Sequence, residues 1–193
     1  MRIIAGERRG AQLFAPKGMD TRPTQAKVKE SLFNMLQADV PGARVLDLFA
    51  GSGNLALEAL SRGAESAVLV DADREAAACI RRNVQKLRFE DRSALYRCDW
   101  RQAVAQMKVA ETQPFDLVFL DPPYRMTELW DICDALADAC LLAPHAVLAL
   151  EHRTGALSAP KGRFAPYKQR AYADTEIHVY RFEDPDTGSC EEE

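Results

Sequence analysis

The tetrapeptide Asp121-Pro122-Pro123-Tyr124 has the residue types in this chain best suited to chemistry. It follows the apolar run 115–120, which predicts a buried strand. The Asp121 carboxylate is a hydrogen-bond acceptor, and the fixed φ of Pro122 can hold its carbonyl as a second acceptor. Tyr124 adds a face for stacking. We therefore predict that Asp121, Pro122 and Tyr124 act on a flat ring with an exocyclic amine, although the segment also fits a strand-ending turn.

A second motif, DLFAGSG at residues 47–53, joins a predicted strand to a predicted helix. Its glycines permit a tight turn and close approach of a ligand, and the helix N-terminus that follows attracts negative charge. Asp71 ends the next predicted strand 20 residues after Gly51, where a ribose-binding acid is expected. With Ala56 the pattern also fits a dinucleotide-binding turn, so an oxidoreductase that uses a nicotinamide or flavin dinucleotide is an alternative.

Asp47 argues against a dinucleotide, because a carboxylate before the turn would repel a pyrophosphate but suit the ammonium group of an amino acid. S-adenosyl-L-methionine carries such an ammonium, a ribose, and a methyl sulfonium that would face the strand before Asp121. We therefore expect it as the cofactor. The residues expected to bind it are Asp47, Phe49, Gly51, Gly53 and Asp71.

Composition limits the class of protein. The 193 residues are 47% hydrophobic and 28% charged, which is typical of a globular domain. No apolar run approaches the roughly 20 residues of a membrane span, and the N-terminus lacks a signal-peptide pattern. The five cysteines show no Cys-x-x-Cys spacing and the three histidines lie far apart. We therefore expect a cytoplasmic protein with reduced thiols, no membrane contact and no metal site.

Charge is distributed unevenly although the net charge is only −4. The last twelve residues hold six acidic and no basic residues, so the remainder has 25 Lys and Arg against 23 Asp and Glu. Residues 1–30 hold seven basic and three acidic residues. Such a basic segment binds nucleic acid if it borders a site, and is otherwise ordinary solvated surface.

The elements that position the two motifs alternate from residue 43 onward. Strands are expected at 43–49, 66–70, 94–98, 115–120 and 146–151, and helices at 54–62, 74–87, 101–110 and 128–142. Repeated βα units predict a parallel α/β sheet with helices on both faces. The runs 164–172 and 176–182 are too close for a crossover, which predicts a C-terminal antiparallel hairpin. Cys133 and Cys140, seven residues apart, are expected on one buried helix face.

The first forty residues differ from this pattern. Two apolar stretches flank Arg8-Arg9-Gly10 and predict a hairpin, and Thr24 is expected to cap a helix that starts near Gln25. The predicted organisation is therefore a hairpin-and-helix extension at 1–40, a cofactor-binding domain at 41–182 and an acidic disordered tail at 183–193.

The two motifs together resemble the S-adenosylmethionine-dependent amino-methyltransferases with a seven-stranded, mostly parallel Rossmann-like class I fold. The chain is further similar to the bacterial 16S rRNA guanine-N2 methyltransferases of the RsmD family. The similarity runs in family order through the segments RIIAG, PKG, TRPT, VKESLFN, LEALSRGA and DTEI. The chain departs from the family pattern at residues 25–27, where an acid is usual, and at 54–56. The resemblance implies 16S rRNA, within an assembled or assembling small subunit, as the partner; we expect a monomer.

The resemblance also implies roles that spacing alone leaves open. In that family the turn after the third strand flanks the adenine, which places Asp99 and Trp100 against the cofactor. A helix cap at Asp99 and a core position for Trp100 are the alternative. The residues expected to bind RNA beside the site are Arg8, Arg9, Arg22, Thr24 and Lys27.

The predicted reaction is in-line transfer of the sulfonium methyl to an exocyclic base nitrogen. Asp121 and the Pro122 carbonyl would accept the amine hydrogens and free the nitrogen lone pair, while Tyr124 would hold the base by stacking. An adenine-N6 nucleic-acid methyltransferase and a non-catalytic RNA-binding or assembly module with this fold are the alternatives. Only the resemblance favours guanine N2 over adenine N6.

Overall fold

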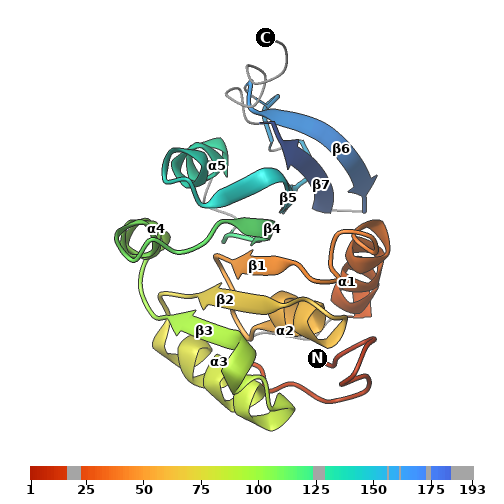
Figure 1. Cartoon of the computed structure of the whole chain (residues 1–193). Coiled ribbons are helices and arrows are strands. Elements are labelled where there is room, and N and C mark those ends of the chain that lie inside the picture. Colours follow the sequence, from red (N-terminus) through yellow and green to blue (C-terminus); the bar gives the residue numbers. More distant parts are fainter. Residues whose placement is uncertain (17–22, 124–128, 156, 161, 173–174, 184–193) are drawn as a thin grey trace.

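The computed structural model describes residues 1–16, 23–123, 129–155, 157–160, 162–172 and 175–183. The sheet has seven strands in the order β3-β2-β1-β4-β5-β7-β6 (Figure 1). They are β1 (Arg44–Asp47), β2 (Ser66–Val70), β3 (Ser93–Tyr96), β4 (Phe115–Leu120), β5 (Leu142–Arg153), β6 (Phe164–Ala171) and β7 (Thr175–Phe182). Strands β1 to β5 are parallel, and β7 pairs antiparallel with β5 and β6. This confirms the predicted Rossmann-like sheet with its C-terminal hairpin.

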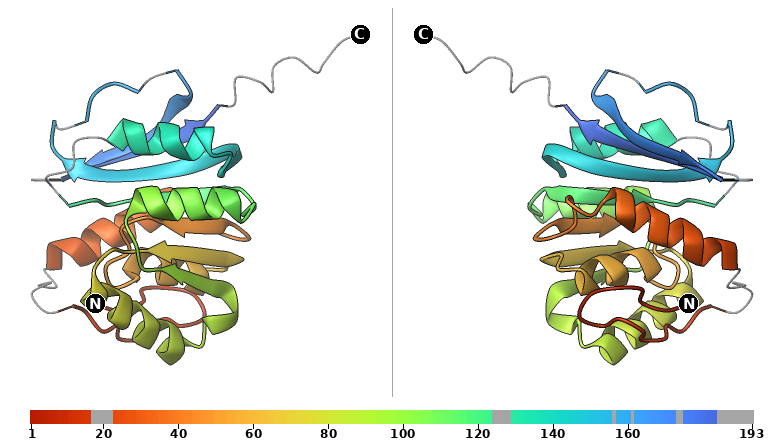
Figure 2. Two further views of the ribbon diagram at one scale, coloured as in Figure 1. Left: turned by 90° about the vertical axis from the view of Figure 1, so that its left-hand side faces the viewer. Right: turned by 90° about the vertical axis from the view of Figure 1, so that its right-hand side faces the viewer.

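Helices cover both faces of this sheet. They are α1 (Pro23–Met35), α2 (Asn54–Ser61), α3 (Arg74–Leu87), α4 (Trp100–Val109) and α5 (Leu129–Asp138), with a 3-10 turn η1 at Glu90–Arg92. One core joins α1, α2 and α3 to the sheet, and the other joins α4 and α5 to it. Figure 2 shows α4 and α5 in front of the sheet in one view and α1 and α2 in the other. The central strands are buried on both sides, which explains their nearly continuous apolar sequences.

Two predicted helix boundaries are wrong for local reasons. Helix α1 begins at Pro23, whose missing N–H costs nothing in a first turn, so the backbone of Thr24 lies inside the helix and not at its N-cap position. Helix α5 ends at Asp138, and the chain turns at Cys140, which has a φ of 55°, before β5 starts. Cys133 is therefore buried while Cys140 is exposed, and they do not share a helix face.

The predicted N-terminal hairpin is reduced to a wide loop. Its antiparallel pairing consists of one bridge, Arg2 with Gln12, supported by hydrogen bonds such as Ile3 N to Ala11 O at 2.9 Å. Gly6, with a φ of 82°, lies so close to α2 that a Cβ would be 1.7 Å from the Ser61 carbonyl oxygen. The loop thus packs on α2 instead of extending as two strands.

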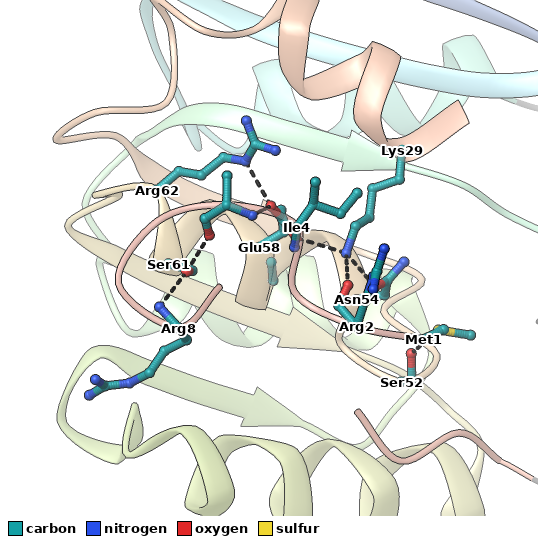
Figure 3. Close-up of polar contacts among 12 residues, drawn as sticks. Met1, Arg2, Ile4, Arg8, Lys29, Ser52, Asn54, Glu58, Ser61 and Arg62 are labelled. Atoms are coloured by element: carbon teal, nitrogen blue, oxygen red, sulfur yellow. Dashed lines mark hydrogen bonds and ion pairs between the residues drawn. The ribbon is translucent and has the colours of Figure 1, made fainter. Parts of the chain in front are cut away.

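Buried ionic contacts attach this loop and α1 to α2 (Figure 3). The Glu58 carboxylate, which is fully buried, accepts hydrogen bonds from Ile4 N at 2.7 Å and Ala5 N at 2.9 Å. It also pairs with Lys29 Nζ and with Arg62 Nε, each at 2.8 Å. The N-terminal extension consequently shares a core with the rest of the domain. Apart from Glu183, the predicted acidic tail lies outside the described residues.

Within the described ranges, no helix combines the length and the apolar character that a membrane crossing requires.

Candidate active site

Acidic side chains gather at the carboxyl ends of four neighbouring parallel strands. Asp47 is the last residue of β1, Asp71 follows β2, and Asp121 follows β4. Glu151, on β5, lies beside Asp121 because the two strands are in register up to the preceding residue pair. Ligands of open α/β sheets bind at this edge. The fold thus brings the two sequence motifs together and adds a fourth acid.

The glycine turn after β1 has the backbone conformation that its sequence predicts. Gly51 and Gly53 have φ values of 55° and 79°, which disfavour other residues. Gly51 N donates a hydrogen bond of 2.8 Å to Asp71 Oδ2, so this acid is oriented toward the turn. A Cβ on Gly53 would be 3.0 Å from the Leu57 side chain, and the lack of one lets the chain turn tightly into α2.

Three acids at these strand ends have pKa values above the usual range of carboxylates, so they keep their protons to a higher pH. Burial raises the pKa of Asp47 to about 7, a shift that the charges of Asp121 and Asp71 reinforce and a hydrogen bond from Ala56 N opposes. Surrounding protein atoms raise the pKa of Asp121 to about 6, although part of its surface is open to solvent. Burial, and then the charge of Asp121, raises the pKa of Glu151 to about 8. Such a cluster would attract a cation that relieves the repulsion among its charges.

Replacing Asp47 with asparagine should stabilise the ligand-free protein above about pH 7. The folded-state pKa of Asp47 lies above the usual 3.8, so the folded state binds more protons and stability is lost as the pH rises through about 7. Asparagine does not ionise and escapes this loss. Urea unfolding should show a gain on the order of 1 kcal/mol or more near pH 8 and none near pH 4. A gain that shrinks as the pH rises would contradict the shift.

The turn after β3 has the arrangement that the alternative interpretation expects. Asp99 caps α4 by accepting a hydrogen bond from Arg101 N at 2.9 Å, and its side chain is exposed. Trp100 is only 6% exposed and belongs to the core under α4. Asp99 is therefore a helix cap and Trp100 a core residue, and their predicted contacts with the cofactor stay predictions.

Of the other predicted site residues, the structure describes some and leaves others outside its described ranges. Pro122 is buried, and Phe49 is half-buried against the core under α4 and α5. Tyr124 and Arg22 lie outside the described residues, as does the side chain of Thr24. Their predicted roles stay predictions.

Arg8 and Arg9 are not near these acids. Arg8 donates from Nε to Leu87 O at 2.7 Å and from its backbone N to Ser61 Oγ at 3.0 Å. Ser61 and Leu87 are the last residues of α2 and α3, which begin beside the site and extend about 12 and about 20 Å from it. The loop with Arg8 and Arg9 thus lies at the opposite side of the sheet from the acids, near the amino ends of the parallel strands. The contacts of Gly6 and Glu58 hold the loop there.

Lys27 has a different position, on the first two turns of α1. Its side chain is exposed. Two residues later, Lys29 Nζ bonds to Asn54 Oδ1 at 2.8 Å, and Asn54 is the first residue of α2 after the glycine turn (Figure 3). Lys27 therefore lies toward the edge of the sheet that carries the acids.

Comparisons with known proteins identify the family. A family model described as "Conserved hypothetical protein 95" matches residues 1–181. The "Putative rRNA methyltransferase YlbH" of Bacillus subtilis is 37% identical over 182 residues, which are 94% of this chain and 98% of that protein. The "Ribosomal RNA small subunit methyltransferase D" of Escherichia coli is 36% identical over 151 residues, 78% of this chain and 74% of that protein. The chain belongs to the RsmD family.

Solved structures agree with this assignment to the RsmD family. The "Putative methyltransferase yhhF" of Escherichia coli aligns with a TM-score of 0.84 at 32% identity, covering 95% of this chain and 98% of that one. The "putative methylase HI0767" of Haemophilus influenzae aligns with a TM-score of 0.78 at 28% identity, covering 95% and 99%.

Sequence reasoning missed one acid in this RsmD-family site. Glu151 ends the strand predicted at 146–151, but its importance depends on that strand lying next to the one before Asp121. Glu151 is an acid at the carboxyl end of a predicted parallel strand, a feature that it shares with Asp47 and Asp71.

Proposed function

We propose that this protein is an S-adenosylmethionine-dependent methyltransferase that modifies the exocyclic N2 amine of a guanine in small-subunit ribosomal RNA. The observation that supports this most is the pairing of β1 with β4, which puts Asp47 and its glycine turn beside Asp121 and Pro122. The named relatives of this chain are ribosomal RNA methyltransferases, which supports the RNA class.

The residues of the glycine turn and the strand ends fit the cofactor. Gly51 and Gly53 let its amino-acid part approach the backbone, and Asp47 would receive the α-ammonium. Asp71 already accepts Gly51 N, but each carboxylate oxygen has a second lone pair with which to accept a ribose hydroxyl. The raised pKa values of Asp47 and Asp121 mark a site that favours positive charge. When bound, the cofactor would supply an electrophilic methyl group.

The base would be held at the end of β4. Asp121 has a pKa of about 6, so it is ionised at neutral pH and accepts one hydrogen of the amine, while the Pro122 carbonyl accepts the other. Glu151, with a pKa of about 8, stays protonated there and adds no second negative charge beside Asp121. With both hydrogens held, the nitrogen lone pair would be free to accept the methyl, Asp121 would take up the proton that the methylated nitrogen loses, and orientation would supply most of the acceleration.

The RNA would reach this edge beside the start of α1. Replacing Lys27 with alanine should weaken RNA binding most at low salt and lower the salt slope of the affinity by about one. Fluorescence anisotropy with a 16S rRNA fragment over a range of salt concentrations measures this. Arg9→Ala is the matched control, because Arg9 is also exposed but lies at the far edge of the sheet. Equal losses in the two variants would contradict this path for the RNA.

The function is tested by transfer of a tritiated methyl group from the cofactor to small subunits, and to naked 16S rRNA, from cells that lack the protein. Recovery of N2-methylguanosine supports the proposal. N6-methyladenosine would support the adenine enzyme instead. Cofactor binding without transfer to either substrate would favour the non-catalytic module.

A further inference from the structure

Two histidines and a glutamate meet at the end of the β5–β7 pair. Glu176 pairs with His152 across the two strands, and His178, two residues farther along β7, pairs with Leu150. Because alternate residues share a face, all three side chains lie on the side of the sheet that packs against α5. One ligand atom from each lies within 4.8 Å of the others. The histidines are far apart in sequence, which is why their spacing predicts no metal site.

Among the described residues, His152 presents a ring nitrogen with no hydrogen-bond partner. Its side chain is 7% exposed, and its Nδ1 lies 2.7 Å from the Arg153 carbonyl oxygen. A carbonyl oxygen only accepts, so Nδ1 carries the proton and Nε2 keeps a lone pair. Nε2 is buried and has no hydrogen-bond partner among the described residues. A backbone carbonyl that holds Nδ1–H is the usual way to direct Nε2 at a metal ion.

The other two side chains lie close to His152. The His178 and His152 rings lie 4.9 Å apart with an angle of 80° between their planes. His178 Nε2 is 3.8 Å from Glu176 Oε2, and His178 Nδ1 is 3.3 Å from the Tyr180 hydroxyl, which can accept its proton. In that tautomer His178 directs an Nε2 lone pair toward the Glu176 carboxylate, and His152 adds its own Nε2 lone pair in the same cluster.

We propose that His152, Glu176 and His178 bind a divalent transition-metal ion, zinc by preference. Two imidazoles and one carboxylate match zinc, whereas magnesium and calcium prefer oxygen ligands alone. Zinc–ligand bonds of 2.0–2.2 Å in tetrahedral geometry need ligand atoms about 3.3 Å apart, so small side-chain rotations close the site. The fourth position stays open to water.

The position indicates a structural role for this ion. Glu151 precedes His152 and points to the other face of the sheet, where its pairing partner Ile177 lies in the core under α1. On the face with the histidines, Tyr180 packs against Trp130 at 4.9 Å, and Trp130 is in the first turn of α5. The ion would therefore link β5 to β7 next to α5, the helix that follows Asp121 in the chain. It would stabilise the fold and take no part in methyl transfer.

The test starts from the full chain after treatment with a chelator. Zinc is titrated into this protein in a calorimeter, and thermal unfolding is measured with and without zinc. We expect one bound equivalent and a raised unfolding midpoint. Glu176 is half-buried, and glutamine preserves the shape of its side chain. Glu176→Gln should weaken zinc binding at least about tenfold and remove the thermal shift. His178→Gln should do the same.

The matched control is His145→Asn, which removes the third histidine from an exposed position that has a φ of 62°, a conformation asparagine tolerates. It should bind zinc like the unchanged protein. Equal zinc affinity in Glu176→Gln, His178→Gln and the unchanged protein would overturn the proposal, as would the absence of binding. None of these readouts depends on methyl transfer, so they are separate from the test of the proposed function.

Discussion

Replacing Asp121 with alanine should slow methyl transfer by about 10²–10⁴-fold while S-adenosylmethionine still binds. The carboxylate lies at the end of β4 and, in the proposed mechanism, accepts a hydrogen of the attacking amine. Its loss removes an acceptor that acts as the new bond forms, whereas the glycine turn and Asp71, which would bind the cofactor, stay in place. The transfer rate of the unchanged protein should also fall as the pH drops through about 6, because the surrounding protein atoms raise the pKa of Asp121 to that value.

Single-turnover transfer and calorimetric cofactor binding together measure this effect. Asp116→Ala is the matched control: Asp116 is an exposed acid on the same strand, but it lies at the opposite end, where it accepts a hydrogen bond from Arg44 N at 2.8 Å. It should retain near-normal transfer. Turnover of Asp121→Ala near that of the unchanged protein would refute the mechanism. Parallel loss of transfer and cofactor binding would assign Asp121 to the cofactor instead.

Replacing Glu58 with glutamine should destabilise the protein by about 3–5 kcal/mol, the usual effect of breaking a buried ion pair. Glu58 is fully buried, and its partner Lys29 is only 5% exposed. Burial lowers the pKa of Lys29, and Glu58 opposes that shift. Glutamine keeps one acceptor oxygen but leaves the Lys29 charge uncompensated, and it weakens the attachment of Ile4 and Ala5.

Urea unfolding measures this loss. Glu75→Gln, an exposed change in the first turn of α3, should stay within about 0.5 kcal/mol of the unchanged protein. Adding Lys29→Met to Glu58→Gln should recover part of the loss, because no unpaired charge from that pair then remains buried. A loss of stability below about 1 kcal/mol in Glu58→Gln would show that the buried contacts of Glu58 contribute little.

Much of the fold was predictable because its signals are local. The apolar run 115–120 and the helix 74–87 carry their own periodicity, and the structure has both with the predicted bounds. The glycine turn needs positive φ values that glycine accepts at little cost. The short connection between the last two strands permits only an antiparallel pair. Each of these follows from residues close together in the chain.

Local sequence patterns are thus enough to establish the α/β class and the two motifs that meet at the ends of β1 and β4. Long-range packing, by contrast, places Glu151 beside Asp121, bonds Arg8 to the far end of α3, and brings His152 to His178. Local periodicity says which residues of a strand face a core. It does not say which strands are neighbours or where a loop packs, because those depend on contacts between segments far apart in the chain.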